Sequence, residues 1–256
     1  MHEHIRLRIS EGIATISITR PEAFNALSRD IVDVLDGMVE EIENNDNVSV
    51  LVFYSDQHFA AGADIKQMSI CNPEEARTFL FTDTYNKIAS LPMPTIAAIN
   101  GYTFGGGLEL ALCCDLRIAA KSASIGLTEL NLGIMPGAGG TVRLPRLIGE
   151  ARAKEMILLS KVIDGIEAER IGLSNKVVED DQLEAEVYKI AAKLQKKSLV
   201  SIKAAKASIA NGLAETDVIK ATHFEADTWV ELFNSYDQKE GMKAFIEKRK
   251  PKFLNR

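Results

Sequence analysis

Apolar and polar residues alternate in two short segments at the start of the chain. Ile5–Ile9 and Ile13–Thr19 both follow this period of two, and Glu11-Gly12 separates them. A period of two places successive side chains on opposite faces of a strand, and a short connection that contains glycine is typical of a hairpin. The pattern therefore predicts a hairpin of two half-buried strands.

Longer periods and uninterrupted apolar runs follow. After Ser28 the apolar residues Ile31, Leu35, Met38 and Ile42 recur at spacings of three and four. This pattern predicts an amphipathic helix that ends at Asn44–Asn47. The continuous apolar run Val48–Tyr54 predicts a strand that is covered on both faces. A further strand is expected over Thr95–Ile99. Between them we expect a loop and then one helix over Pro73–Ser90.

The next segment is rich in glycine, and the pattern then becomes mainly helical. We expect Gly101–Gly107 to form a loop that leads into a helix, Leu108–Cys114, with a strand over Asp115–Ala119. The remaining expected elements are helices at 142–148, 151–160, 167–171, 183–197, 200–211, 217–233 and 238–248 and one strand at 176–178. Strand and helix units followed by helices predict an α/β protein with a helical C-terminal section.

Composition and charge exclude several classes of function. The chain has 256 residues with 30 Lys and Arg against 36 Asp and Glu, and its net charge of −6 argues against nucleic-acid binding. No apolar run approaches the length of about 18 residues that a membrane span requires. The alternating pattern begins at Ile5, so we expect no signal peptide and a cytoplasmic protein. The three cysteines, Cys71, Cys113 and Cys114, predict reduced, buried thiols and no disulfide framework.

Several common catalytic motifs are absent from the sequence. None of the four histidines has a companion at the spacing of metal ligands, so we expect no metal site, and His58 is the one candidate for a catalytic histidine. Neither a G-x-S-x-G segment nor a phosphate-binding loop of the Walker type occurs. Gly137–Gly140 begins like a dinucleotide fingerprint, but Val142 occupies the third glycine position and no strand precedes it.

Two loops of small residues and two carboxylates remain as candidate chemistry. Phe59–Lys66 follows a buried strand, and Gly105–Gly107 begins a helix that carries Glu109. Small side chains allow a ligand to approach the backbone, and free amides at a helix start favour an oxyanion. A second interpretation is open at this point: the glycines allow tight packing, Glu109 complements the helix dipole, and Glu129 is a first-turn acid after a threonine cap, Thr128.

These residues, in this order, strongly resemble the enoyl-CoA hydratase/isomerase (crotonase) superfamily. The segments that carry the resemblance are Pro21–Leu27, Phe59–Ile65, Asn100–Tyr102 through Gly105–Ala111, Leu132–Thr141 and Gly241–Arg249. Each motif alone is moderately specific, but five of them in order at the usual spacings cover essentially the whole chain.

The resemblance implies an α/β fold, a crotonase-like spiral of ββα units that binds an acyl-CoA thioester. It implies an acyl-CoA-binding core at 1–195 and a helical C-terminal region at 196–256 that serves in trimerisation, so that we expect a homotrimer or a homohexamer built of two trimers. In this family two backbone amides, here those of Ala63 and Gly106, form the oxyanion hole for the thioester oxygen.

The resemblance also assigns residues to substrate binding. The residues on the adenine side of CoA are Ala61, Ala63, Asp64 and Ile65. Lys66 and Lys248 stand where basic residues meet the CoA phosphates, and Ala26 belongs to the same substrate-binding set. CoA is part of the substrate, and we expect no separate cofactor.

The two glutamates of the hydratase subgroup are both present, which favours a hydro-lyase. We expect Glu109 to deprotonate water for attack at Cβ and Glu129 to deliver a proton to Cα. One departure bears on the acyl chain, because Gly126-Leu127-Thr128-Glu129 stands where typical short-chain hydratases read Gly-Gln-Pro-Glu. The alternatives are a Δ3-Δ2-enoyl-CoA isomerase, a hydratase of a branched or cyclic enoyl-CoA, and a non-catalytic CoA-thioester binder, which would have no need of two carboxylates.

Overall fold

The predicted hairpin forms the edge of the main sheet. In the computed structural model, which describes residues 2–256 and their side chains except that of residue 78, β1 (Ile5–Ser10) pairs antiparallel with β2 (Ile13–Ile18). The register places Ile5 opposite Ile18 and Ser10 opposite Ile13. The alternating pattern of the sequence thus predicted both strands and their connection.

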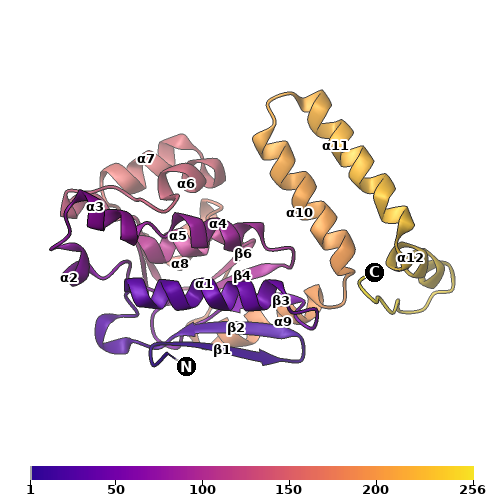
Figure 1. Cartoon of the computed structure of the whole chain (residues 1–256), viewed down its shortest axis with the longest axis horizontal. Helices are drawn as coiled ribbons and strands as arrows, with labels where there is room; N and C mark the ends of the chain where they lie inside the picture. The colour runs from indigo at the N-terminus through magenta and orange to yellow at the C-terminus, as the bar shows by residue number, and fades with distance from the viewer. Residues whose placement is uncertain (1) are drawn as a thin grey trace. The chain divides into compact units, whose positions relative to one another are not determined.

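Four further strands extend the sheet in parallel, in the order β1-β2-β3-β4-β6-β8 (Figure 1). These strands are β3 (Val50–Phe53), β4 (Thr95–Ile99), β6 (Leu116–Ala120) and β8 (Lys176–Val178). Every residue of β3 and β4 is buried, as expected for continuous apolar strands with neighbours on both faces. Because the strands from β2 onward are parallel, the loops that follow them start from one edge of the sheet.

Helix α1 (Arg29–Glu43) begins after Ser28 and buries one apolar face. The buried residues of this face are Ile31, Val32, Leu35, Val39 and Ile42. The expected face contained Met38, but this side chain is half-buried and Val39 is fully buried in its place. Helix and face were therefore predicted, with one position of the face wrong.

The prediction of one helix over Pro73–Ser90 is wrong. The segment forms a turn of helix α3 (Pro73–Ala76), a 3-10 turn η2 (Arg77–Phe79) and helix α4 (Thr82–Ser90). Leu80 between them has extended backbone angles, and Phe81 is only 2% exposed. A β-carbon added to Gly106 would lie 3.7 Å from the Phe81 ring, so the break allows Phe81 to pack at the start of α5.

Two short strands within the glycine-rich region were not predicted. β5 (Tyr102–Phe104) pairs in parallel with β7 (Ser124–Gly126) to form a second sheet of two strands. Three-residue strands are too short for a period of two to stand out. β5 leads directly into helix α5 (Gly106–Cys113), all of whose residues are buried.

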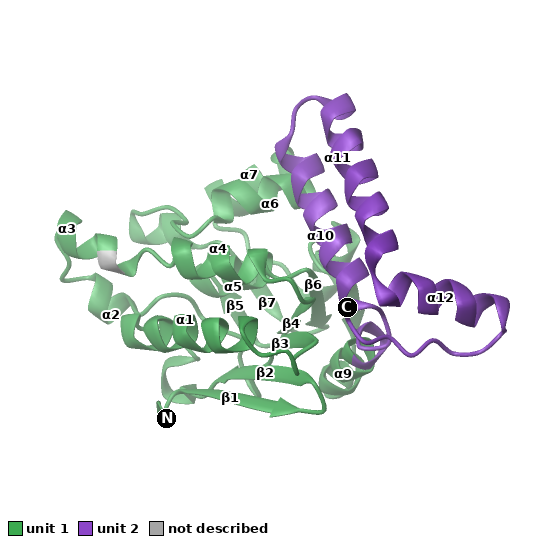
Figure 2. Ribbon diagram, turned by 45° about the vertical axis from the view of Figure 1, so that its right-hand side comes forward, with its two compact units in different colours: residues 1–191 green, residues 192–256 purple. Residues whose placement is uncertain are grey.

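The remaining elements of the first unit are short. They are η1 (Pro21–Ala23), α2 (Ile65–Met68), η3 (Glu129–Leu132), α6 (Gly140–Ile148), α7 (Glu150–Leu158), α8 (Gly165–Arg170) and η4 (Asp180–Gln182). Helix α9 (Leu183–Leu194) reaches the boundary between two compact units of the chain, Met1–Ala191 and Ala192–Arg256 (Figure 2). Each unit is described by itself.

The second unit is helical throughout. Its elements are α10 (Leu199–Ala214), α11 (Val218–Glu231), η5 (Leu232–Asn234) and α12 (Tyr236–Ile246). α10 and α11 lie side by side as an antiparallel pair, yet no residue of either helix is buried (Figures 1 and 2). The segment after α12 folds back onto it, since Asp237 accepts the N–H of Leu254 at 2.7 Å and Glu240 accepts that of Lys252 at 2.7 Å.

Two further sequence-based expectations concern the three cysteines and membrane-spanning helices. Cys113 and Cys114 are free and buried, as expected, whereas Cys71 is free but half-buried. Within residues 2–256, no helix combines the length and the apolar character that crossing a bilayer requires.

Candidate active site

A cavity of about 420 Å³ opens in the first unit between the loops that follow β3, β5 and β7. Its wall combines the backbone of Ala61–Ala63 and Gly105–Gly106 with the carboxyl groups of Glu109 and Glu129. The large apolar side chains that line it are Ile65, Met68, Phe79, Leu80, Phe81, Phe104, Leu132, Ile134 and Met135. The cavity therefore joins a polar end, formed by amides and carboxyls, to an apolar enclosure.

Two backbone amides meet at the polar end. A β-carbon built on Gly106 would lie 3.7 Å from the amide nitrogen of Ala63, so the two residues are neighbours in space. Gly106 is the first residue of α5, where an N–H has no partner within the helix. Among residues 2–256, no group accepts the N–H of either Ala63 or Gly106. Both amides are free to bind an oxygen atom in the cavity.

The loops that present these amides depend on left-handed glycines. Gly62 has φ +103° and Gly105 has φ +49°, values that L side chains rarely adopt. The Leu27 N–H donates to the carbonyl of Gly62 at 2.7 Å, and the Gly105 N–H donates to the carbonyl of Gly126 at 3.0 Å. The backbone that carries the amides is thus fixed by hydrogen bonds to neighbouring segments.

Glu109 is held by the backbone of a glycine-rich loop. Glu109 is only 3% exposed, and its Oε1 accepts the N–H groups of Ala138 at 2.8 Å and Gly140 at 2.7 Å. Burial raises the pKa of Glu109, and these two hydrogen bonds oppose that effect because they favour the charged form. The carboxylate has a fixed direction and a supported negative charge.

Glu129 lies in a different environment. It is the first residue of η3, and its Oε2 is buried without a hydrogen-bond partner in the part of the chain that the structure describes. A β-carbon on Gly105 would lie 3.2 Å from Glu129 Oε1, so this carboxyl borders the amide pair. Burial, with a smaller contribution from the charge of Glu109, raises the pKa of Glu129 to about 7. Two neighbouring carboxyl groups with different environments suit one base and one acid.

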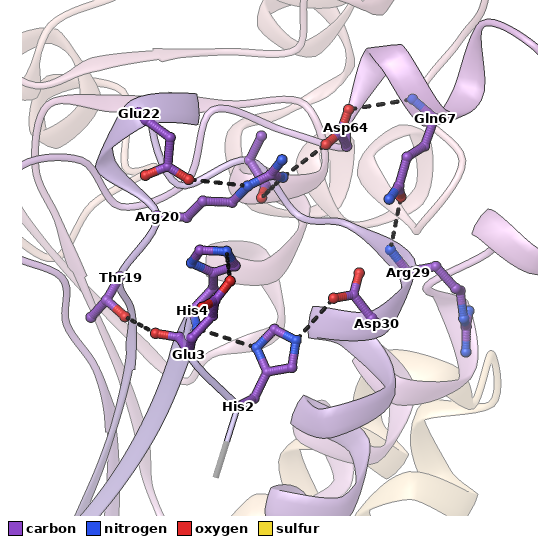
Figure 3. Close-up of polar contacts among 11 residues, drawn as sticks. His2, Glu3, His4, Thr19, Arg20, Glu22, Arg29, Asp30, Asp64 and Gln67 are labelled. Carbon is purple, nitrogen blue, oxygen red and sulfur yellow. Dashed lines mark hydrogen bonds and ion pairs between the residues drawn. The ribbon is translucent and has the colours of Figure 1, made fainter.

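The side chain of Asp64 is occupied by structural contacts. Oδ2 accepts Arg20 Nη1 at 2.8 Å, and Oδ1 accepts the N–H of Gln67 (Figure 3). Oδ1 also accepts the N–H of Lys66 and so caps α2. The same Arg20 guanidinium donates to the carbonyl of Ala26 at 3.4 Å. Asp64 therefore joins the two loops that were predicted to bind CoA, and its carboxylate is paired.

The structure brings most of the predicted residues to one place. Those that line the cavity are Ala61, Ala63, Ile65, Gly106, Glu109 and Glu129. Ala26, Asp64 and Lys66 belong to the adjoining loops without lining it, and the Lys66 side chain is exposed. Lys248 lies in the second unit, after α12, with φ +54°.

His58 is placed outside the cavity and has a structural environment. Its Nδ1 accepts the N–H of Tyr102 at 3.0 Å, and its ring stacks on the Tyr102 ring with centroids 4.6 Å apart. Burial lowers the pKa of His58, so the ring is neutral near pH 7. These contacts support the non-catalytic interpretation of this histidine.

Sequence reasoning missed several residues that shape the site. The apolar wall from Phe79 to Phe81 lay within the supposed single helix. Gly137–Gly140 was rejected as a dinucleotide fingerprint and counted within the motif Leu132–Thr141, but its amides were given no role. Three glycines among the four residues that follow Pro136 do indicate a loop with exposed amides, which was the available signal. Across residues 2–256, no group of three or more His, Cys, Asp or Glu side chains is arranged to hold a metal ion.

Comparison with known proteins finds relatives that match this chain over nearly its whole length and theirs. The family model described as Enoyl-CoA hydratase/isomerase matches residues 8–256. The crotonyl-CoA hydratase of Syntrophomonas wolfei is 42% identical over 259 residues, which cover 100% of this chain and 99% of that protein. The short-chain-enoyl-CoA hydratase of Clostridium acetobutylicum is 42% identical over 242 residues, or 93% of this chain and 92% of that protein.

The fold is equally similar to that of solved structures. The crystal structure of an enoyl-CoA hydratase from Bacillus anthracis matches with a TM-score of 0.95 at 37% sequence identity. The match covers 99% of this chain and 100% of that one. Sequence and structure therefore point to the same relatives over the whole length.

Proposed function

The chain belongs to the enoyl-CoA hydratase/isomerase family, and from that premise we propose that it is an enoyl-CoA hydratase. Such a hydro-lyase adds water across the 2,3 double bond of a trans-2-enoyl-CoA to give a 3-hydroxyacyl-CoA. The predicted family and its α/β crotonase fold are both confirmed by these relatives. The observation that carries the proposed reaction is the meeting of two free amides and two carboxyl groups at one end of an apolar cavity.

The amides of Ala63 and Gly106 bind the thioester oxygen. Addition of a nucleophile at Cβ shifts electrons onto that oxygen and creates an enolate. Two N–H groups already aimed at it stabilise the developing charge, and removal of one such donor typically lowers the rate about 10²–10³-fold. Their loops need no rearrangement, because Gly62 and Gly105 fix them in advance.

The carboxyl groups divide the proton transfers. Glu109, as a carboxylate held by two N–H groups, takes a proton from water as the oxygen attacks Cβ. Glu129, whose pKa is raised by burial to about 7, carries the proton that is delivered to Cα of the enolate. In the reverse direction the roles exchange, so the same pair catalyses dehydration.

The substrate is a short-chain enoyl-CoA. The cavity offers about 420 Å³ in total, and its apolar wall suits a hydrocarbon chain of few carbons. The two relatives at 42% identity are a crotonyl-CoA hydratase and a short-chain-enoyl-CoA hydratase, which supports the same range. Thr128 stands at the wall where the typical short-chain sequence has proline, so the branch tolerance of this enzyme is set there.

CoA itself enters as part of the substrate, and the reaction as proposed uses no other cofactor. Ala61, Ala63, Asp64 and Ile65 border its adenine end, and Ala26 belongs to the same substrate-binding set. Asp64 acts by holding the loops together. Lys66 and Lys248 are the cations that meet its phosphates. We place the enzyme in the cytoplasm.

The second unit assembles subunits into a homotrimer, or a homohexamer of two trimers. Helices α10 and α11 contain no buried residue, and large apolar side chains such as Ile209, Trp229 and Phe233 are 63%, 59% and 38% exposed. Exposed apolar surface of this extent is typical of an interface between subunits. Sedimentation at micromolar concentration tests this, and a stable 28.1 kDa monomer would contradict it.

The test of function is direct. Hydration removes the conjugation between the Cα=Cβ bond and the thioester carbonyl, so crotonyl-CoA should lose its enoyl-thioester absorbance when the enzyme is added. A chain that only binds CoA thioesters would leave the absorbance unchanged. An enzyme restricted to isomerisation would convert a 3-enoyl-CoA and leave crotonyl-CoA intact.

A further inference from the structure

Glu109 takes its position from one loop. Both hydrogen bonds to its Oε1 come from backbone N–H groups, those of Ala138 and Gly140. Gly139 between them has φ +108°, which aims the two flanking amides toward the carboxylate. Any shift of this loop would therefore move the catalytic carboxylate or release it.

Arg143 of α6 clamps the loop. Its backbone N–H donates to the carbonyl of Gly139 at 2.7 Å, and its Nη1 donates to the carbonyl of Ala138 at 3.2 Å. The guanidinium lies so close that a β-carbon on Gly139 would stand 2.0 Å from Nη1. The side chain thus binds the far side of the same peptide segment whose amides hold Glu109.

Helix α4 anchors the clamp from the other side. Asn86 Oδ1 accepts Arg143 Nη2 at 2.6 Å, and Thr82 Oγ1 donates to the carbonyl of Gly137 at 3.2 Å. One turn of α4 therefore fixes both the guanidinium and the start of the loop. This packing gives the contact a defined geometry that a solvated surface arginine would lack.

The positive charge of Arg143 is not neutralised by an ion pair in the part of the chain that the structure describes. Within the described residues no carboxylate lies within ion-pair distance of its guanidinium, and its strong hydrogen bonds go to neutral oxygens. A positive charge near a carboxylate favours the ionised form, and Arg143 lowers the pKa of Glu109 in this way.

We propose that Arg143 is a positioning residue for hydration: it clamps the 137–140 loop that aims Glu109, and its guanidinium places a positive charge on that loop. The proposal rests on the function proposed above, because it assumes that Glu109 acts as the base. It goes further by assigning to Arg143 a role in which the residue never touches the substrate.

Other groups also act on Glu109. Glu129 on η3 is a second acid, and the charge of Glu109 disfavours its ionisation. Tyr85 on α4 and Cys113 on α5 are neutral near pH 7, because burial raises the pKa of both. Arg143 is then the positive group whose charge opposes the effect of burial on Glu109.

Three variants separate the clamp from the charge. Arg143→Met removes both, Arg143→Lys keeps the charge without the two-armed clamp, and Asn86→Asp keeps the hydrogen bond but adds a negative charge beside the guanidinium. Arg146→Met, one turn along the exposed side of α6, is the matched control.

Two measurements read the result. The infrared band of the protonated Glu109 carboxyl, identified by its loss in Glu109→Gln, is titrated in every variant and reports ionisation whether or not the enzyme turns over. The pH dependence of kcat and KM for crotonyl-CoA reports catalysis. Circular dichroism and thermal melting of each variant show that it is folded.

The expected pattern is specific. Arg143→Met should lower kcat by at least about tenfold and move the Glu109 titration upward by about half a pH unit or more. Arg143→Lys should restore the wild-type titration of Glu109 but only part of kcat. Asn86→Asp should move the titration of Glu109 to higher pH while the loop stays clamped. If folded Arg143→Met or Asn86→Asp titrates Glu109 as the wild type does, the proposal is overturned. Wild-type protein that fails to hydrate crotonyl-CoA would instead refute the function, and the infrared titration would still test the effect of Arg143.

Discussion

The amide nitrogen of Ala63 lies 3.7 Å from the point where a β-carbon on Gly106 would stand, and nothing lies closer to that point. An alanine at 106 would therefore fit in ordinary van der Waals contact. One residue later, a β-carbon on Gly107 would stand 2.1 Å from the carbonyl oxygen of Ala60. Adjacent glycines at the start of α5 thus serve different purposes, access to an N–H at one and close packing at the other.

Gly106→Pro should abolish hydration, whereas Gly106→Ala should keep most of it. Proline fits the first turn of a helix but has no N–H, so the variant loses one oxyanion donor and retains the fold. We expect the rate to fall by at least about 10²-fold. Steady-state rates with crotonyl-CoA, with circular dichroism as the check on folding, measure this. A folded proline variant that keeps more than about a tenth of the wild-type rate would remove Gly106 from the oxyanion hole.

Glu109→Gln and Glu129→Gln should each lower kcat by about 10²–10⁴-fold, because glutamine keeps the size of the side chain but exchanges no proton. Binding of a CoA thioester should change little, since the amides remain. The double variant should be scarcely worse than the weaker single variant, because the two groups act as one unit.

Paired assays with both single variants also separate hydratase from isomerase. A pure isomerase that shuttles one proton through Glu129 would lose activity in Glu129→Gln and keep most of it in Glu109→Gln. Substantial hydration of crotonyl-CoA by Glu109→Gln would show that our assignment of the base is wrong.

The pH dependence of kcat/KM should be bell-shaped. Glu109 must be ionised, so activity falls on the acidic side of its pKa, and Glu129 must be protonated, so activity falls as the pH rises above about 7. Because the two carboxyl groups interact, the apparent pKa values of the two limbs belong to the pair and not to either glutamate alone. In Glu129→Gln the alkaline limb should disappear from the residual rate. A wild-type profile that stays flat from pH 6 to about 9 would contradict the acid role of Glu129.

Gly107→Ala should destabilise the first unit, and Gly37→Ala should stabilise it. The added methyl group at 107 collides with the backbone of Ala60, for a cost of about 1–3 kcal/mol or more. Gly37 lies in the exposed interior of α1 with nothing within 4 Å of its β-carbon position, so alanine gains about 0.5–1 kcal/mol there. Urea unfolding of both variants measures the opposite signs, and equal effects would contradict the packing described for Gly107.

Much of the fold could be predicted because its elements depend on local pattern. The hairpin Ile5–Ser10 with Ile13–Ile18, helix α1 and the buried strands β3 and β4 each have a period or an apolar run that no other structure fits well. The break at Leu80 could not be predicted this way. It depends on the packing of Phe81 against Gly106, two residues far apart in the sequence.

In the candidate site, too, the residues could be predicted from the sequence but the contacts between them could not. Ala63, Gly106 and the two glutamates stand in motifs whose order is itself informative, and the structure gathers all four around one cavity. The contacts that orient them, such as Ala138 to Glu109, join segments that no short-range pattern connects. Which N–H reaches which carboxylate is decided by tertiary packing.

Cys71 offers a chemical reporter of what occupies the cavity. It lines the cavity and is half-buried, whereas Cys113 and Cys114, the other two thiols of the sequence, are buried. A maleimide added to the folded protein should therefore label Cys71 first and give nearly homogeneous single modification. A bound CoA thioester should slow that labelling by shielding the thiol, so the labelling rate doubles as a binding isotherm that needs no turnover and no engineered probe.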